Sequence, residues 1–460
     1  MDDSPTFDSS PLSLRDKRTA LGLPAANIAD DVSVVNLPRG PLAKSIAKVR
    51  NSLSVWGFVD QGVVSIASFA AAAIVGRACG SIELGIYTLA VRIFWLAAGI
   101  PNALIWMPYT SRAPRMNRTR QKYFLGSATV HLLLIVLGIA TVLVGVAIVP
   151  LLGLSDKQWL LPMCLALIPF STLMLLREHL RRYLLAHMQT ASLLKVDVPI
   201  AACQLLILAG LAWTQKLSAV SALLGMAVGC GWGVLWVALH RDRFRVASRR
   251  VAAHWGHNFQ FGKWLLVVSI AWLVSDASYY WLVESFHGLT AMGQFSAAAI
   301  TVMLFNPVLL TVQNLSRSVL SNSYAQGGSK ELREKTMRGS GAVVVGFGVL
   351  FVGLAISGGT LVELAFGDEF AGLGAIVASL CLGMYLQVCF VPIEAGLTAL
   401  QDGKGMLAGS LLRLALILAS GIPLIAWYGA IGVGFAMAIG SFGAGMLQWK
   451  FFHRRCPRAD

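Results

Sequence analysis

Charged residues are scarce in this chain, since Asp, Glu, Lys and Arg together make up only 13% of its 460 residues. Hydrophobic residues make up 56%, and the mean hydropathy is +0.69, well above that of ordinary soluble globular chains. This composition excludes a soluble globular domain as the main structure. It predicts an integral membrane protein.

Several familiar motifs are missing as well. None of the seven cysteines belongs to a Cys-x-x-Cys pair, so we expect neither a disulfide framework nor a metal site and interpret them as buried apolar residues. No Walker A sequence is present, so energy from ATP would require another subunit. The glycine groups Gly225-Met-Ala-Val-Gly229 and Gly429, Gly432 and Gly434 are interpreted as points of close helix packing.

The first fifty residues lack the apolar core that a signal peptide needs. They are rich in Asp, Ser, Pro and basic residues, which predicts a disordered cytoplasmic tail over residues 1–50. Within this tail, residues 44–50 are interpreted as a solvated linker, in preference to a short basic helix on the membrane surface.

Long apolar runs, by contrast, are abundant. A helix needs about 20 mostly apolar residues to cross about 30 Å of hydrocarbon. Such runs predict an all-α integral membrane protein with about twelve transmembrane helices in two six-helix lobes, residues 51–250 and 251–460. The runs are 53–76, 84–108, 124–149, 158–180, 198–214, 218–239, 263–284, 289–312, 341–362, 372–393, 407–427 and 431–450.

Basic residues are concentrated in every second loop, and therefore on one side of the predicted topology. The loops after the odd-numbered spans carry only Arg77, Lys157 and Lys216. Because cytoplasmic loops are enriched in Lys and Arg, both termini are predicted to lie in the cytoplasm of a multi-pass protein of the cell membrane. The other side carries groups such as Arg112, Arg115, Arg118, Arg120 and Lys122, then Arg177, Arg181, Arg182 and Lys195, then Arg241, Arg243, Arg245, Arg249 and Arg250.

The net charge of +15 is therefore assigned to topology and to contact with anionic phospholipids. Nucleic acid is not expected as a partner, because no basic domain with interleaved aromatic residues lies outside the membrane.

Two short segments recur at matching places in the two halves. Residues 83–91 resemble residues 291–299, and the equivalent glycines Gly85 and Gly293 are 208 positions apart. Residues 180–189 resemble residues 392–401 at an offset of 212. Halves of six spans each predict a parallel repeat with a cavity between the lobes, where alternating access would expose a substrate to either side.

Charged residues inside predicted spans identify a candidate site. Each well-buried charge costs about 2.5 kcal/mol or more in lipid unless it faces a partner or a watery cavity. A hydrated, charged cavity accounts for all of them, whereas the alternative is that pairs such as Asp60 with Arg413 only hold helices together. The residues are Asp60, Arg92, Asp276, Glu394 and Arg413.

The residue types suggest roles within this cavity. Arginine suits a phosphate-bearing substrate because its planar guanidinium binds phosphate oxygens in a bidentate manner and keeps its proton. Asp276 and Glu394 are candidates for proton or sodium coupling, and no other cofactor is expected. Uncharged polar residues either hydrogen-bond sugars or bridge helices: Gln61, Asn102, Asn306, Gln313 and Asn314. Prolines within spans each remove a backbone hydrogen bond and permit a helix kink: Pro101, Pro169, Pro307, Pro392 and Pro423.

The stretches Asp60–Phe69, Val75–Ala90 and Arg182–Gln189 resemble segments of the polysaccharide flippases, the transporters of O-antigen and exopolysaccharide precursors. These flippases belong to the multidrug, oligosaccharidyl-lipid and polysaccharide exporter (MOP) superfamily. The resemblance extends over about residues 50–450, whereas the N-terminal tail and the loop at 108–114 are not hallmarks of the family.

The resemblance implies a MATE-like fold of twelve helices in two lobes. It also implies that the chain moves an undecaprenyl-diphosphate-linked oligosaccharide to the outer leaflet during polysaccharide biosynthesis, alongside other polysaccharide-assembly membrane proteins. In such a flippase, Arg77 and Arg92 fall where cavity or gate arginines occur.

Three alternatives are open. A major-facilitator carrier would have a Gly-x-x-x-Asp-Arg type signature between spans two and three, which residues 109–122 lack. A multidrug exporter shares the expected fold, and a cavity richer in acidic residues than in arginine would favour it. A membrane polysaccharide polymerase or ligase would present a large outer loop with catalytic residues, but the outer loops here are short. No catalytic residue is assigned, and the chain is expected not to be an enzyme.

Overall fold

The computed structural model describes residues 41–233, 235 and 244–456, with the side chains of 41–55, Arg115, Phe261 and Trp264 left undescribed. The chain divides into two units, Met1–Ser54 and Val55–Asp460. In the first unit residues 41–54 are helical, so the expectation of a linker over residues 44–50 is wrong. The rest of the predicted tail, residues 1–40, lies outside the described residues. Everything that follows concerns the second unit.

The described part of the chain is helical and contains no strand. Nine of its helices are long and apolar enough to cross a membrane. The protein is therefore a multi-pass, all-α membrane protein, as predicted. The elements are α2 (Pro41–Pro101), η1 (Asn102–Trp106), α3 (Met107–Arg112), η2 (Ala113–Arg115), α4 (Arg118–Leu151), α5 (Leu160–Ala186), α6 (Thr190–Trp213), α7 (Ala219–Gly229), α9 (Ser248–Met303), α10 (Asn306–Phe366), η4 (Asp368–Phe370), α11 (Gly374–Cys389), α12 (Val391–Ala399), α13 (Gly403–Tyr428) and α14 (Ala430–Arg455).

Three of the longest helices bend sharply at a glycine. The φ and ψ angles are 82° and −176° at Gly80 in α2, 80° and −179° at Gly288 in α9, and 63° and −152° at Gly328 in α10. A positive φ with an extended ψ is accessible to glycine but strongly disfavoured for other residues. Each bend falls between two predicted spans, so these helices reverse direction there. The number of twelve spans stays a prediction.

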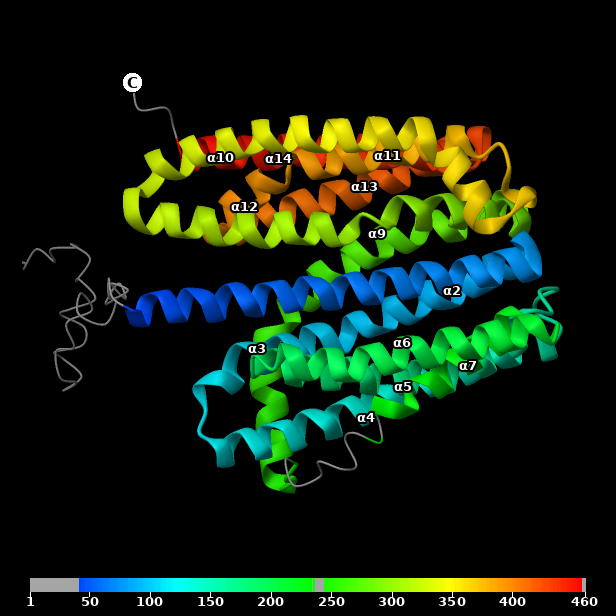
Figure 1. The fold of residues 1–460 in the computed structure, drawn as a ribbon, viewed down its shortest axis with the longest axis horizontal. Coiled ribbons are helices and arrows are strands. Elements are labelled where there is room, and N and C mark those ends of the chain that lie inside the picture. Colours follow the sequence, from blue (N-terminus) through cyan, green and yellow to red (C-terminus); the bar gives the residue numbers. More distant parts are fainter. Residues whose placement is uncertain (1–40, 234, 236–243, 457–460) are drawn as a thin grey trace, which may run out of the picture. The chain divides into compact units, whose positions relative to one another are not determined.

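The helices form two bundles (Figure 1). We call them the N-terminal bundle, α2 from Val55 to α7, and the C-terminal bundle, which runs from the later part of α9 to α14. The first part of α9 packs against α4 and η1 of the N-terminal bundle. In the N-terminal bundle, α5 packs against α4, α6 and α7; in the C-terminal bundle, α14 packs against α11 and α13. Large apolar side chains such as Ile356, 82% exposed, cover the outer surface. This is the surface expected of helices that contact lipid tails.

The bends reveal a repeat between the bundles. Gly80 and Gly288 are 208 residues apart and have nearly the same backbone conformation. The repeat also appears in their contacts: a Cβ on Gly85 would lie 2.8 Å from the carbonyl oxygen of Leu289, and one on Gly293 would lie 1.8 Å from that of Ser81. Since 289 is 81 plus 208 and 293 is 85 plus 208, each contact is the counterpart of the other. This reciprocity is the signature of a two-fold axis.

The second repeated segment has a slightly different offset from the predicted one. The α5–α6 turn, between Ala186 and Thr190, corresponds to the α12–α13 turn, between Ala399 and Gly403, at an offset of 213 and not 212. Met188 and Gln401, also 213 apart, both have φ of 54°. The shared turn conformation therefore aligns the two segments at an offset of 213, which residue identities alone did not reveal.

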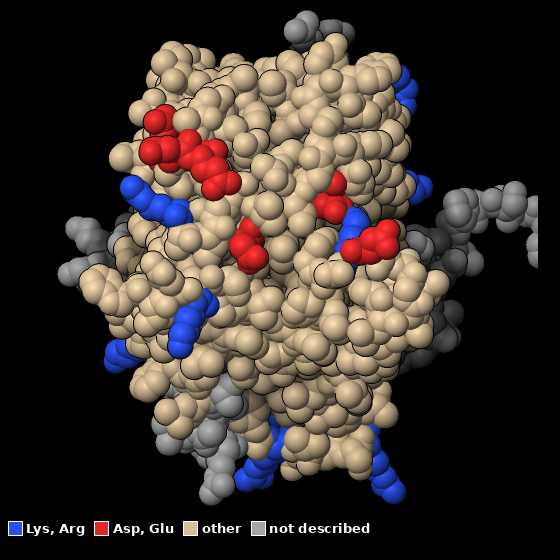
Figure 2. Space-filling model, turned by 90° about the vertical axis from the view of Figure 1, so that its right-hand side faces the viewer, with Lys and Arg blue, Asp and Glu red and all other residues tan. Residues whose placement is uncertain are grey.

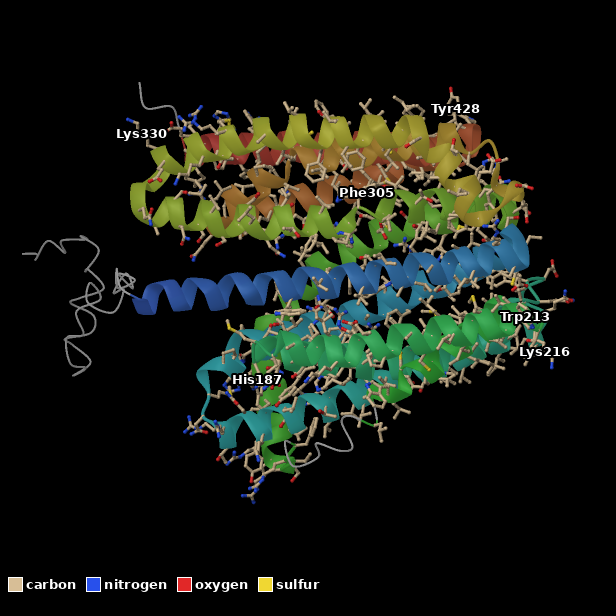
Figure 3. All side chains as sticks on the ribbon, in the orientation of Figure 1. His187, Trp213, Lys216, Phe305, Lys330 and Tyr428 are labelled. Carbon is tan, nitrogen blue, oxygen red and sulfur yellow. The ribbon has the colours of Figure 1, made fainter. Side chains whose placement is uncertain are left out.

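The two ends of the bundles differ in composition. Trp213, Lys216 and Tyr428 lie at one end, which we call the glycine end because Gly80 and Gly288 bend there; Lys330 lies at the opposite end, the basic end (Figure 3). Figure 2 looks onto the glycine end, where acidic side chains gather over part of the face. The positive-inside rule predicts the orientation of a membrane protein from such a difference in charge between its two ends. The orientation itself stays a prediction.

Gly225, Gly229, Gly432 and Gly434 are packing points, as predicted. Gly429 is not, because it has a φ of 59° at the end of α13 and a Cβ there would meet nothing closer than 3.8 Å. A Cβ on Gly434 would lie 2.2 Å from the backbone of Ser379, and one on Gly432 would lie 2.2 Å from the carbonyl oxygen of Leu424. The bends, however, lie at glycines. Pro169 and Pro423 lie inside the continuous helices α5 and α13, and the kinks that these prolines permit stay a prediction.

Candidate functional site

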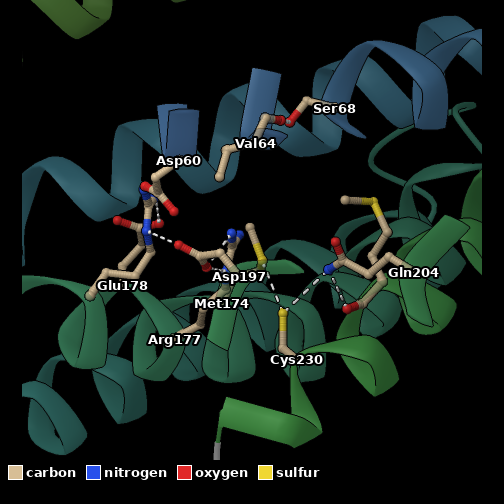
Figure 4. Close-up of polar contacts among 11 residues, drawn as sticks. Asp60, Val64, Ser68, Met174, Arg177, Glu178, Asp197, Gln204 and Cys230 are labelled. Carbon is tan, nitrogen blue, oxygen red and sulfur yellow. Dashed lines mark hydrogen bonds and ion pairs between the residues drawn. The ribbon is translucent and has the colours of Figure 1, made fainter. Parts of the chain in front are cut away.

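Buried charges in the N-terminal bundle form one closed cluster (Figure 4). Arg181 Nη2 donates to Asp60 Oδ2 at 2.8 Å, Arg181 Nη1 donates to Glu178 Oε1 at 3.1 Å, and Arg181 Nε lies 2.7 Å from Asp197 Oδ2. Arg177 binds Asp197 Oδ1 with both Nε and Nη2, at 3.0 and 2.8 Å. All five side chains are buried.

This cluster corrects two expectations. Arg177 and Arg181 were expected at the end of a span or in the following loop, but α5 continues to Ala186 and buries both. Asp60 was given as a partner for Arg413, but its partner is Arg181. The sequence did contain a signal for the cluster. Arg181 lies one turn after Arg177 and Glu178, so its side chain shares a helix face with both. Asp197 directly precedes the predicted span 198–214.

The N-terminal cluster balances its own charge. Arg182, one residue beyond Arg181, is close enough to Glu178 to stabilise that carboxylate, and its guanidinium lies 5.6 Å from the ring centre of Trp106. Three arginines therefore face three carboxylates. Such a set holds α2, α5 and α6 together and needs no further ion.

A second ion pair joins the two bundles. Arg92 on α2 donates from Nη1 to Asp276 Oδ2 on α9 at 2.8 Å, and from Nη2 to the hydroxyl of Tyr280. The Arg92 guanidinium lies 4.1 Å from the centre of the Tyr280 ring, an attractive cation–π distance. The structure thus brings together two predicted site residues, Arg92 and Asp276, from opposite halves of the sequence.

The C-terminal bundle encloses a polar cavity of about 230 Å³. Three predicted site residues meet there: Gln313, Glu394 and Arg413. Residues that the sequence interpretation did not single out complete its lining: Trp272, Arg317, Gln387, Phe390, Val391, Gly409, Ser410, Ser441, Ala444, Gly445 and Gln448. Arg317 had been counted only as a loop charge. The sequence has no charge pattern that would distinguish the four additional uncharged polar residues, Gln387, Ser410, Ser441 and Gln448.

Arg413 is the unusual member of this cavity. Its Nη2 donates to Gln387 Oε1 at 2.9 Å, but no carboxylate of the described residues lies within 4.0 Å of its guanidinium. Its Nε and the buried Ser441 Oγ both lack a hydrogen-bond partner within the described structure. Glu394 faces Arg317 instead, with 4.0 Å between the nearest atoms. The cavity therefore contains an uncompensated positive charge.

The remaining predicted site residues lie elsewhere. Arg77 is exposed at the glycine end and donates from Nη1 to the carbonyl oxygen of Leu364 at 3.1 Å. Gln61 and Asn102 are half-buried, the latter at the start of the π-helix η1. Asn306 and Asn314 are exposed on α10. None of these five lines the cavity around Arg413, and their contact with a substrate stays a prediction.

Solved structures show which fold this is. An inward-facing multidrug-resistance MATE transporter of the MOP superfamily is similar with a TM-score of 0.71 at 14% identity, over 85% of this chain and 94% of that one. The lipid II flippase MurJ, in an inward closed conformation, is similar with a TM-score of 0.69 at 14% identity, over 87% of each chain. The chain has the fold of MOP-superfamily transporters.

A third similar structure is a MOP-superfamily transporter from Pyrococcus furiosus, with a TM-score of 0.62 at 13% identity over 89% of this chain and 95% of that one. Reverse polarity of its binding pocket is described as suggesting a different function. No protein-family model and no curated protein sequence matches this chain. The MATE-like fold predicted from the sequence is confirmed, while the polysaccharide-flippase subfamily stays a prediction.

Proposed function

We propose that this protein is a transporter that flips a lipid-diphosphate-linked oligosaccharide across the cytoplasmic membrane by alternating access. Two observations support a transporter: nine helices of the described chain are fit to span a membrane, and the fold is shared with MATE transporters and with the lipid II flippase MurJ. The second of these neighbours handles a lipid-linked substrate.

One observation carries the choice of cargo, namely the uncompensated charge of Arg413 in the cavity of the C-terminal bundle. Arg413 is half-buried. A cation inside a membrane helix that has no carboxylate partner is costly and is expected where it serves a ligand. Guanidinium groups bind phosphate oxygens in a bidentate manner and stay charged in a low-dielectric site. The diphosphate of a lipid carrier would supply the missing negative charge, and the surrounding glutamines would bind sugar hydroxyls.

Export of small molecules is the second candidate, because a multidrug-resistance MATE transporter is similar to this chain with a TM-score of 0.71. The charge of the cavity distinguishes the two. Two arginines, Arg317 and Arg413, face one carboxylate, Glu394. A cavity for cationic drugs would have more carboxylates than arginines, so we favour an anionic cargo.

Energy for transport is proposed to come from a proton or a sodium ion. Glu394 is suited to this task because it lines the cavity and its side chain is 41% exposed, with only a distant contact to Arg317. Asp276 is less available, because Arg92 holds it. Both termini and the basic end are proposed to face the cytoplasm, where anionic phospholipids and polysaccharide-assembly membrane proteins would be neighbours.

The test is the sidedness of the lipid-linked oligosaccharide in cells that lack the gene and carry a plasmid copy. An impermeant sugar-modifying reagent applied to spheroplasts reports which leaflet holds the oligosaccharide. We expect wild-type protein and the Arg338→Gln control, which alters an exposed pair with Glu334, to restore outer-leaflet labelling.

Arg413→Gln is expected to reduce labelling at least about tenfold, the effect of losing one charge-assisted hydrogen bond. Full labelling with Arg413→Gln would remove the basis of the proposal, and unchanged sidedness without the gene would favour small-molecule export.

A further inference from the structure

Two ion pairs of the described residues join the bundles, and the one between Arg92 and Asp276, to which Tyr280 is bound, is the more buried on its basic side. Arg92 belongs to the N-terminal bundle, whereas Asp276 and Tyr280 belong to the C-terminal bundle. The side chains of Arg92 and Asp276 are only 14% and 21% exposed. The other inter-bundle ion pair, Lys157 with Glu284, is 47% exposed on the lysine side and lies near the glycine end.

The position along the helices places this contact deep in the membrane. Arg92 lies twelve residues after Gly80, and Asp276 lies twelve residues before Gly288. At a helical rise of 1.5 Å per residue, both are about 18 Å from the glycine end. In a hydrocarbon layer about 30 Å thick, that is close to the middle.

The contact is not duplicated by the repeat. At the offset of 208, Arg92 corresponds to Ile300 and Asp276 corresponds to Ser68, whose hydroxyl donates to the carbonyl oxygen of Val64 in its own helix. Among the described residues, one charged contact therefore joins the two bundles at this depth, on one side of the pseudo-two-fold axis.

Beyond this contact, the glycine end is closed. The main chains touch at Gly85 with Leu289 and at Gly293 with Ser81. Ser81 N, at the start of the helix that follows the Gly80 bend, donates to Glu369 Oε1 of η4 at 3.0 Å. That carboxylate from the C-terminal bundle thus caps a helix of the N-terminal bundle. Ser81 itself is 2% exposed.

We propose that Arg92, Asp276 and Tyr280 form a lock that holds the bundles together at mid-membrane and keeps the glycine end closed. Separating the bundles at this depth leaves a guanidinium and a carboxylate without partners, which is far more costly in a membrane interior than in water. Tyr280 is a positioning residue. Its hydroxyl and ring hold the Arg92 guanidinium in the plane from which Nη1 reaches Asp276.

The lock can be tested without knowing the cargo, by measuring how often the glycine end opens. The reporter is the thiol introduced by Ser81→Cys, in protein whose seven native cysteines are replaced by serine or alanine, purified in lipid nanodiscs. A water-soluble maleimide labels this reporter thiol only when the bundles separate at the glycine end. We expect Asp276→Asn to increase the labelling rate at least about tenfold, because each factor of ten in the open population corresponds to about 1.4 kcal/mol.

Three further variants distinguish loss of the lock from a nonspecific effect of substitution. Arg92→Asp combined with Asp276→Arg reverses the pair and is expected to restore slow labelling, while Tyr280→Phe is expected to give an intermediate rate. Lys157→Gln breaks the exposed inter-bundle pair and is expected to change the rate less than about twofold, since exposed pairs contribute little.

A second reporter detects unfolding. Cys164, kept as the single cysteine in protein that retains Ser81, is 1% exposed within the N-terminal bundle and should stay unlabelled in every variant. Wild-type labelling of the Ser81→Cys reporter in both Asp276→Asn and Tyr280→Phe would overturn the proposal, as would fast labelling in the charge-reversed pair with Cys164 still protected. The outcome does not depend on the proposed cargo, so failure of one proposal leaves the other standing.

Discussion

A charged side chain inside a membrane helix needs a partner, and the buried charges of this protein meet that need in different ways. Arg177 and Arg181 have carboxylate partners at hydrogen-bond distance within one bundle, and Arg92 has its partner across the two bundles. Arg413 has only an amide. The first kind stabilises the fold, whereas the last kind carries a cost that a ligand would relieve.

Asp197 provides a test at the residue scale. Its side chain is fully buried and binds both Arg177 and Arg181, so Asp197→Asn leaves two buried guanidinium groups short of a partner. We expect this change to lower the free energy of unfolding by about 3–5 kcal/mol, the usual cost of breaking a buried pair. Thermal unfolding in detergent measures it as a lower Tm.

The matched control is Glu334→Gln, which removes one partner of the exposed pair with Arg338 on α10. An exposed pair contributes little, so its effect should stay within about 0.5 kcal/mol. Equal Tm values for the two variants would show that the N-terminal cluster does not stabilise the bundle.

At the scale of the helix, glycine sets the direction of the chain. Gly80 and Gly288 each reverse a helix at the glycine end with φ near 80°. Their surroundings differ. A Cβ on Gly80 would lie 2.8 Å from Glu369 Oε2, whereas a Cβ on Gly288 would meet nothing within 4 Å. A side chain at Gly288 would therefore cause backbone strain alone, whereas a side chain at Gly80 would cause backbone strain and a steric clash.

Alanine substitution at these glycines gives the second prediction. Gly288→Ala adds only backbone strain and is expected to destabilise the protein by about 1–3 kcal/mol. Gly80→Ala adds a clash with the Glu369 carboxylate and is expected to be worse. Gly353→Ala, in the interior of α10 with nothing within 4 Å, should be neutral or stabilising by up to about 1 kcal/mol. Tm values in the order Gly80→Ala, Gly288→Ala, wild type, rising, would agree; a wild-type Tm for Gly288→Ala would not.

The helices were largely predictable because apolar length is a local property. The end of α5 was not, because the run of apolar residues is interrupted at Arg177 to Arg182 while the helix continues to Ala186. Burial of those charges depends on Asp60 and Asp197, which come from other helices. Gln387 and Ser441 were missed at the site for a similar reason. A polar residue in an apolar run marks a cavity only once the packing of the helices is known.

At the scale of the whole molecule, each end carries a lysine that can be used to determine the orientation in the membrane. Lys216 lies at the glycine end, and Lys330 lies at the basic end (Figure 3). The predicted orientation places the glycine end outside the cell and the basic end in the cytoplasm. Each residue therefore reports one side of the membrane.

Single-cysteine variants give the corresponding prediction. Lys216→Cys in a background without other cysteines should react with an impermeant maleimide in intact cells, whereas Lys330→Cys should react only after permeabilisation. The positive-inside rule supplies the reason, since reversing the protein would place its basic loops outside. Equal labelling of Lys330→Cys before and after permeabilisation would show the opposite orientation.

The reciprocal contact at the glycine end is made by main chain alone, since neither Gly85 nor Gly293 places a side chain between the helices. The cavity around Arg413, by contrast, is lined by side chains of the C-terminal bundle. In the proposed transporter, closure and selectivity would thus depend on separate sets of atoms. A lineage of such transporters would be free to exchange one cargo for another by substituting cavity side chains, while the surfaces that close the path stayed as they were.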